Sequence, residues 1–143
     1  MKYLKIFVLI LFIKQVSFAQ DIGECRKIVD LTIESINNGS TDCLHTYLSD
    51  DFTIAGQKGK IAKMVLKQLF SQLGEKVKSH REIKERKMGK GLELVYNIDY
   101  MKMGHKEATF IFNESNLLTE LTLFKMERRL PNRDSGRKEN YRD

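Results

Sequence analysis

The chain has 143 residues, of which 41% are hydrophobic and 31% charged, and its formal net charge is +6 at pH 7. A chain of this size can bury a core as one domain but is too short for two. Three of its 25 basic residues fall in the first 19 positions, which leaves 22 basic against 19 acidic side chains in the rest. So mild a surplus argues against nucleic acid as a partner, and the basic residues from Lys76 to Lys90 fit a solvated strand face.

The first 19 residues have the three parts of a secretory signal peptide. Lys2 and Lys5 form a basic start, Ile6–Ile13 is an unbroken apolar run, and 17–19 place small residues before a cleavage point. The apolar run covers about 12 Å as a helix, whereas a bilayer core requires roughly 20 residues. We therefore expect cleavage after Ala19, a periplasmic or secreted protein, and no membrane span in the mature chain.

The first half of the remaining chain has the apolar spacing of helices. Positions that recur at three and four predict a helix over 24–38, which ends at Gly39, and a third helix over 60–73, which ends at Gly74. Between them we expect a short second helix from Thr41 or Asp42 through Tyr47 and a brief strand over 52–55. The expected core positions of the first helix are Cys25, Ile28, Val29, Thr32, Ile33 and Ile36, and those of the third are Ile61, Met64, Val65, Leu69 and Leu73.

After Gly74 the apolar period changes from 3.6 to 2, which indicates strands. Four are predicted, over 76–88, 92–103, 107–113 and 117–126, and their short separators favour an antiparallel meander. Alternation places three sets of side chains inward: Leu92, Leu94, Tyr96, Ile98 and Tyr100; Ala108, Phe110 and Phe112; Leu117, Leu121 and Leu123. It places Leu118, Phe124 and Met126 on the opposite face of the last strand.

The predicted fold class is therefore α+β, with three N-terminal helices packed on a curved four-stranded antiparallel meander. We expect a signal peptide over 1–19, this domain over 20–129 and a disordered polar tail over 130–143, where the composition becomes almost free of apolar residues. The predicted first helix separates Cys25 from Cys43 by more than a disulfide can bridge, unless the second helix folds back sharply. Two small, buried thiols are the favoured interpretation.

This order of elements resembles the nuclear transport factor 2-like superfamily, whose fold is an α+β cone. The likeness covers about Cys25 to Met126 and includes two local stretches, Tyr-Leu-Ser-Asp-Asp-Phe over 47–52 and Leu-Thr-Leu-Phe-Lys-Met over 121–126. The chain looks like an exported bacterial member. The resemblance implies a possible homodimer through the sheet, and it brings in enzymes such as ketosteroid isomerase, polyketide cyclases and dehydratases. In these an aspartate or histidine acts as base and a tyrosine or acid stabilises an oxyanion.

Six aromatic side chains are candidates to line the cone's pocket: Tyr47, Phe52, Tyr96, Tyr100, Phe110 and Phe112. They can surround an apolar small molecule, or they can fill the interior as an ordinary core. An enzyme also needs an ionisable group beside Tyr96 or Tyr100. The nearest candidates are Asp99, His80 and Arg81, but alternation places Asp99 and His80 on the solvent side unless a bulge reverses it.

No other motif in the sequence carries chemistry. His45, His80 and His105 stand apart from one another and from metal-ligand partners, and neither cysteine has an activating context, so we predict no catalytic motif, no metal site and no cofactor. Gly56-Gln57-Lys58-Gly59-Lys60 is too short for a nucleotide-binding loop and fits a plain turn.

The functional prediction is an exported, non-enzymatic binding or interaction module that uses its sheet face or a small apolar pocket. Its partner is a small apolar ligand or another protein. Two alternatives remain open: a small isomerase, dehydratase or cyclase acting on a hydrophobic substrate, and an accessory domain of an exported protease system.

Overall fold

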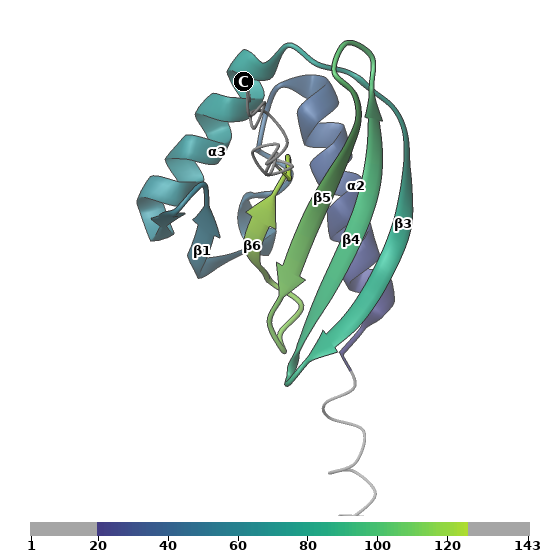
Figure 1. Cartoon of the computed structure of the whole chain (residues 1–143). Helices are drawn as coiled ribbons and strands as arrows, with labels where there is room; N and C mark the ends of the chain where they lie inside the picture. The colour runs from purple at the N-terminus through teal and green to yellow at the C-terminus, as the bar shows by residue number, and fades with distance from the viewer. Residues whose placement is uncertain (1–19, 126–143) are drawn as a thin grey trace, which may run out of the picture.

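A computed structural model describes residues 20–125 of the chain (Figure 1). The predicted signal peptide and the predicted tail lie outside these residues. The described helices are α2 (Ile22–Asn38), the 3₁₀ turn η1 (His45–Tyr47) and α3 (Gly59–Leu73). The strands are β1 (Leu48–Ile54), β2 (Gln57–Lys58), β3 (Val77–Met88), β4 (Gly91–Tyr100), β5 (Gly104–Phe112) and β6 (Leu118–Thr122).

Helix α2 has a capping residue at each end. The side chain of Asp21 accepts a hydrogen bond from the backbone N–H of Glu24, which satisfies one of the free donors of the first turn. Gly39 ends the helix with φ of 64°, a left-handed conformation that glycine adopts without strain, and its N–H donates to the carbonyl of Ile36. The predicted helix and its buried face are confirmed, because Cys25, Ile28, Val29, Thr32, Ile33 and Ile36 are all buried.

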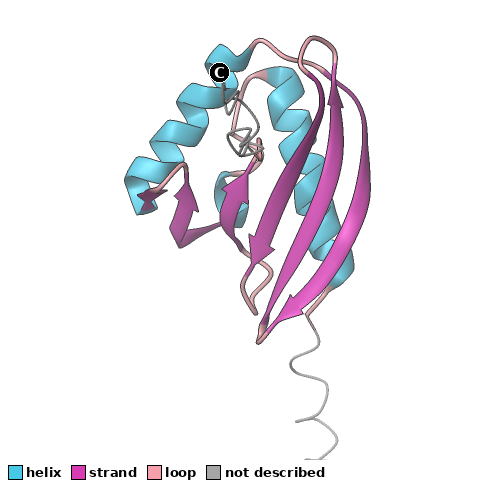
Figure 2. Ribbon diagram, in the orientation of Figure 1, coloured by secondary structure: helices cyan, strands magenta, loops and turns pink. Residues whose placement is uncertain are grey.

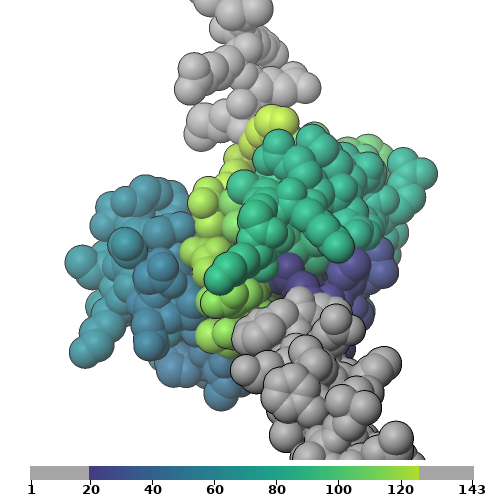
Figure 3. Space-filling view, turned by 90° about the horizontal axis from the view of Figure 1, so that it is seen from below, coloured from purple at the N-terminus to yellow at the C-terminus, as the bar shows by residue number. Residues whose placement is uncertain are grey.

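The six strands form one mixed sheet in the order β2-β1-β6-β5-β4-β3. The strands from β3 to β6 pair as the predicted antiparallel meander, and β1 then joins β6 in parallel. Figure 3 shows the consequence: β6 lies between the blue part made by β1 and α3 and the green part made by the long strands. In Figure 2 the long strands β3, β4 and β5 curve around α2.

The predicted numbers of helices and of strands are both wrong: the described residues form two α-helices and six strands, not three helices and a four-stranded meander. The expected second helix is a turn followed by η1, and the chain already becomes extended at Leu48, so β1 has seven residues rather than four. It lengthens because β6 offers it a hydrogen-bonding edge, a partner about 70 positions away that local periodicity does not reveal. The turn after β4 also comes earlier than predicted, at residues 101–103.

The buried face of α3 differs in part from the predicted one. Val65, Leu69 and Leu73 are half-buried and pack against the core, as predicted. The sheet covers Ala62, Leu66 and Phe70, whereas Ile61 and Met64 are 59% and 70% exposed. The helix carries apolar residues on more than one stripe, and periodicity alone does not choose between them. The stripe with the large Phe70 ring faces the core.

The inward residues of the last strand also differ in part from the prediction. A register shift between Ile111 and Phe112 leaves Thr119 as an extra residue in β6, so Leu118 and Leu121 both face the core. Leu118 is fully buried and Phe124 packs against the core, which corrects the assignment of both to the outer face. Leu121 and Leu123 are buried, as predicted.

The core lies between α2, α3 and the inner face of the sheet, and all five predicted inward residues of β4 are buried there. No helix among residues 20–125 is long and apolar enough to cross a membrane.

Candidate functional site

The six aromatic candidates come together inside the fold. Five of them are buried, with exposures of 6% for Tyr96 and 1% or less for the rest, and Tyr47 packs against the same core while half-buried. The Tyr96 and Phe110 rings meet edge to face with centroids 5.8 Å apart. Neither of the two hollows described below is lined by any of the six. In this structure they fill the interior, and lining of a ligand pocket stays a prediction.

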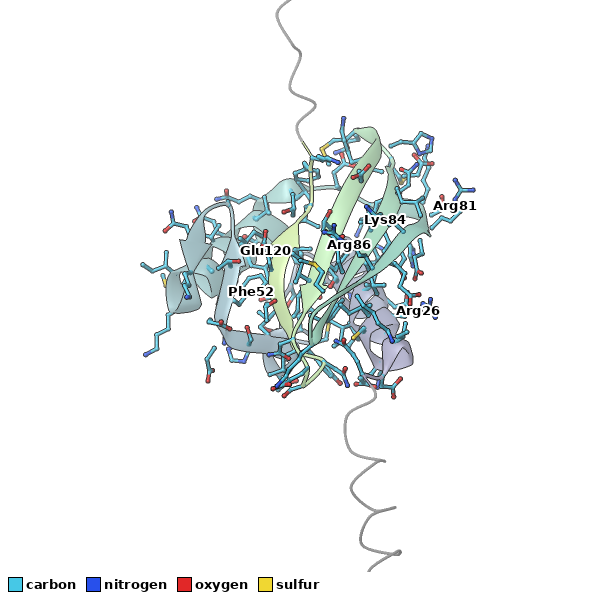
Figure 4. All side chains as sticks on the ribbon, turned by 60° about the horizontal axis from the view of Figure 1, so that its bottom comes forward. Arg26, Phe52, Arg81, Lys84, Arg86 and Glu120 are labelled. Atoms are coloured by element: carbon cyan, nitrogen blue, oxygen red, sulfur yellow. The ribbon has the colours of Figure 1, made fainter. Side chains whose placement is uncertain are left out.

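The hydroxyl of Tyr96 is committed to an ion pair between α2 and β3. It donates to Glu82 Oε2 at 3.0 Å, and both oxygens of that carboxylate also accept from the Arg26 guanidinium, at 2.8 and 3.1 Å. Arg26, labelled in Figure 4, also reaches Glu85 at 3.1 Å. The hydrogen bond from Arg26 holds the pKa of Glu82 below its usual range, while burial and the Glu82 carboxylate raise the pKa of Tyr96. This network joins helix to sheet and offers no free acid or base.

Among the described residues, none of the ionisable side chains considered for catalysis hydrogen-bonds to either tyrosine, although the His80 ring packs on the Tyr96 ring with centroids 5.9 Å apart. His80 lies on the side of β3 that is turned toward α2, where its Nε2 is 3.0 Å from Asp30 Oδ1, and the residue is still exposed. The predicted exposure of His80 is confirmed, but the predicted face is wrong, because β3 carries two register shifts, after Val77 and after Glu82, which change which residues face inward. Asp99 faces His105 at 3.7 Å, and Arg81 lies at the outer edge of the sheet in Figure 4.

Tyr100 is different from Tyr96 because its hydroxyl has no partner. The side chain is fully buried, and among the described residues its Oη is the one buried side-chain polar atom without a hydrogen bond. Burial, and to a smaller extent the carboxylate of Glu75, raise the pKa of Tyr100 to about 12, so the group is a neutral hydrogen-bond donor at pH 7. A buried hydroxyl left unpaired costs about 1–3 kcal/mol, and such a group points to a site.

A groove of about 400 Å³ lies between α3, the β1–β2 turn and the end of β6. Most of its lining is apolar: Ile54, Ala55, Leu69, Leu121, Leu123 and Phe124 contribute, together with Thr53, Gly56, Glu120 and Thr122. Phe124 both lines the groove and packs on Tyr100, with ring centroids 5.8 Å apart. It follows the last residue of β6, so its backbone is outside the strand ladder. The Phe124 ring therefore contacts both the groove and the ring of Tyr100.

Glu75 is a residue of this region that the sequence analysis missed. It follows α3, is 5% exposed, and accepts a hydrogen bond from the backbone N–H of Lys102 at 3.2 Å. A lone carboxylate in a helix-to-strand connection gives no periodic signal, and its burial arises from the β4–β5 turn that folds over it. The neighbouring Met101 N–H donates to the carbonyl of Lys76 in the same connection.

A second hollow, of about 510 Å³, lies at the opposite end of the long strands beside the β3–β4 turn. Its lining combines Ile22 and Leu92 with the polar residues Gln20, Lys87, Lys90 and Glu114 and the glycines at 89 and 91. None of the candidate aromatics and no unpaired buried group described above lies in it.

Both cysteines are free thiols. Cys25 is fully buried and burial raises its pKa to about 11, whereas Cys43 is exposed, with its sulfur 3.1 Å from Ser35 Oγ. The prediction of two buried thiols is therefore right for Cys25 and wrong for Cys43.

No family model and no curated protein matches the sequence. Solved structures do resemble the fold. A DUF4783 family protein from Bacteroides ovatus is 15% identical, with 66% of this chain and 92% of that chain covered and a TM-score of 0.49. An NTF2-like protein of unknown function from Cytophaga hutchinsonii is 17% identical over 70% of this chain and 88% of that one, with a TM-score of 0.45. A putative polyketide cyclase from Sinorhizobium meliloti is 13% identical over 66% and 91%, with a TM-score of 0.45. The α+β class predicted from the order of elements is confirmed by the helices and the sheet themselves. The likeness to nuclear transport factor 2-like proteins stays a resemblance.

Proposed function

We propose that the protein is a non-enzymatic binding module for a small, mostly apolar molecule that carries one hydrogen-bond acceptor. The unpaired, fully buried hydroxyl of Tyr100 is the observation that carries this proposal. The groove supplies the apolar surface, and a ligand that displaces the Phe124 ring reaches the hydroxyl. Ligand sites commonly combine an apolar lining with a few placed polar groups in this way.

The absence of a free catalytic group at Tyr96 supports binding over catalysis. Its hydroxyl and both oxygens of Glu82 are already engaged, so a substrate would have to break an ion pair to use them. Among the described residues, Asp99, His80 and Arg81 make no hydrogen bond to either tyrosine.

The binding test uses Prodan, a naphthalene with a single ketone acceptor whose emission moves to shorter wavelength on burial and to longer wavelength when the ketone accepts a hydrogen bond. We expect the purified protein to bind Prodan. Tyr100→Phe should weaken binding by roughly tenfold, the worth of one buried hydrogen bond, and should move the emission of bound Prodan further to the blue. Phe124→Ala, which removes the ring that packs on Tyr100, should bind Prodan at least as tightly as the unchanged protein.

Tyr96→Phe is the matched control, because it deletes a hydroxyl that is already hydrogen-bonded outside the groove. It should leave Prodan affinity and emission unchanged. Equal affinity and equal emission for Tyr100→Phe and the unchanged protein would show that the hydroxyl does not meet the ligand. Native mass spectrometry beside denaturing mass spectrometry then shows whether a natural small molecule copurifies, and Phe124→Ala should change its occupancy.

Glu75 gives one specific reason to retain the enzymatic alternative. A carboxylate beside a buried tyrosine hydroxyl can remove a proton next to a ketone while the hydroxyl stabilises the enolate oxygen. In this second proposal, cyclohexanone in D₂O takes up deuterium at its α-carbons faster with the protein than with Glu75→Gln, as followed by mass spectrometry. Equal uptake rates would leave the binding module as the sole proposal.

The proposed export, the homodimer through the sheet and the role beside an exported protease rest on the sequence alone. A homodimer is tested by light scattering of the purified chain across a hundredfold dilution. The mixed charges of the sheet's outer face, such as Arg86 paired with Glu93, are compatible with a second copy but do not single one out.

A further inference from the structure

The outward face of α3 exposes two large apolar side chains. Ile61 is 59% and Met64 70% exposed, and with a spacing of three they stand side by side on the helix surface. Periodicity assigns both to the core, together with Val65, Leu69 and Leu73. Those three do pack against the core, beside the buried Leu66 and Phe70, whereas Ile61 and Met64 stay outside it. Two exposed side chains of this size on adjacent turns form a small apolar patch with no contact to explain it.

Positive charge surrounds this patch. Lys60, Lys63 and Lys67 lie on the same helix, Lys58 precedes it, and the helix contains no acidic residue. Lys60 and Lys67 are exposed and Lys63 is half-buried along the flank. A helix that presents apolar side chains bordered by lysines has the character of an interfacial membrane helix, in which apolar groups enter the acyl boundary and lysines meet anionic headgroups.

We propose that the α3 face, defined as Lys60, Ile61, Lys63, Met64 and Lys67, docks the protein on an anionic phospholipid surface. Charge complementarity selects this occupant. A second copy is disfavoured, because a two-fold contact would place the same lysines against each other. The proposal is independent of the groove ligand, since Leu69, the residue of α3 that lines the groove, lies on another side of the helix.

The test is cosedimentation of the purified full chain with vesicles. One set contains 30% phosphatidylglycerol in phosphatidylcholine, and the other contains phosphatidylcholine alone. We expect binding to the anionic set that weakens when salt is raised from 0.05 to 0.5 M. The triple variant Lys60→Glu, Lys63→Glu, Lys67→Glu should lower the partition coefficient by at least about a hundredfold, since each lysine near the surface contributes about fivefold.

The pair Ile61→Gln, Met64→Gln tests the apolar part and should lower partitioning by roughly tenfold or more. Met101→Gln is the matched control, because Met101 is 60% exposed but lies in the β4–β5 turn, and it should bind like the unchanged protein. Circular dichroism of every variant establishes that the fold is kept. Any leader that remains on the chain is common to all variants, so differences among them report α3 alone.

Three outcomes would overturn the proposal. One is equal binding to neutral and anionic vesicles, and another is full binding by the lysine variant. The third is a dimer, seen by light scattering without vesicles, that Ile61→Gln, Met64→Gln dissociates, because that result assigns the patch to a second copy. No α3 variant is expected to change the affinity for Prodan. Failure of the membrane proposal and failure of the groove proposal can therefore be told apart.

Discussion

Two tyrosines four positions apart on β4 show how much depends on a single partner. Tyr96 donates to a carboxylate held by Arg26, and its hydroxyl therefore adds to the attachment of α2 to the sheet. Tyr100 points into the same interior, and its hydroxyl lacks a partner among residues 20–125. The first arrangement stabilises the fold, while the second costs stability and has a use only when something occupies the site.

Removing the two hydroxyl groups should have opposite effects on stability. Tyr100→Phe deletes an unpaired buried group and should raise the free energy of unfolding by about 1 kcal/mol. Tyr96→Phe leaves the carboxylate short of one donor and should lower it by a similar amount, about 1 kcal/mol. Urea unfolding followed by circular dichroism measures both. A loss of stability for Tyr100→Phe would mean that its hydroxyl already has a partner in solution, such as a buried water.

Glu82 predicts how stability depends on pH. The guanidinium of Arg26 lowers the pKa of Glu82 in the folded state, so the folded protein holds this carboxylate ionised at a pH where the unfolded chain already binds a proton. Glu82 therefore contributes stability above its unfolded pKa of about 4.3, and this contribution disappears as pH falls through the lower folded value.

The measurement is the free energy of unfolding in urea between pH 6 and pH 3. The unchanged protein should lose stability more steeply over this range than Glu82→Gln, which has no proton to bind. Glu114→Gln is the control, because Glu114 meets only the exposed Lys90 at 3.7 Å and should retain the full slope. Parallel curves for the unchanged protein and Glu82→Gln would contradict the role given to Arg26.

At the scale of elements, the tight contact between β4 and β5 depends on one glycine. A Cβ atom added at Gly91 would stand 2.5 Å from the carbonyl oxygen of Phe112. We expect Gly91→Ala to lower the free energy of unfolding by roughly 2 kcal/mol, because a backbone atom has to move. Gly89→Asn is the control: its φ is 60°, which asparagine tolerates, and the space around it is open, so the cost should be about 0.5 kcal/mol or less. Equal costs would show that β5 yields without strain.

The sequence could predict the elements that are set by their own residues. Helix α2 has a cap at each end and one clear apolar stripe, and β4 alternates cleanly, so both faces were predicted correctly. The errors arise where distant partners decide. The length of β1 depends on β6, the face of α3 depends on which stripe fits the sheet, and bulges in β3 and β6 reverse side chains that alternation had placed.

In the candidate site, too, local sequence predicts which residues face inward but not which partners they meet. Composition and alternation identify Tyr96 and Tyr100 as inward residues, and both are. The two differ in function because of Glu82, Arg26 and Phe124, which come from other elements and meet them only in three dimensions. Glu75 was missed for the same reason, since its burial depends on a turn some 27 positions later.

At the scale of the whole molecule, the predicted signal peptide implies a definite mass for the purified protein. Expression of the complete chain in a bacterium that exports proteins should give a purified product that begins at Gln20, as read by intact mass spectrometry. Ala19→Arg, which places a large charged residue at the cleavage point, should leave the leader attached. An unchanged protein recovered at full mass in the cytosolic fraction would contradict the prediction of export.

The place of β6 in the sheet has a consequence for how the chain acquires its structure. This strand is last in sequence among those described, yet it is central, with β5 on one side and β1 on the other. Until residues 118–122 have left the ribosome, β1 and β5 have no strand between them, and β1 cannot join the sheet of the long strands. Loop closure over this distance makes folding a late event. For a chain with a predicted leader, such a delay leaves the sheet incomplete until synthesis is nearly finished, and an incomplete fold is easier to thread through a membrane channel than a finished one.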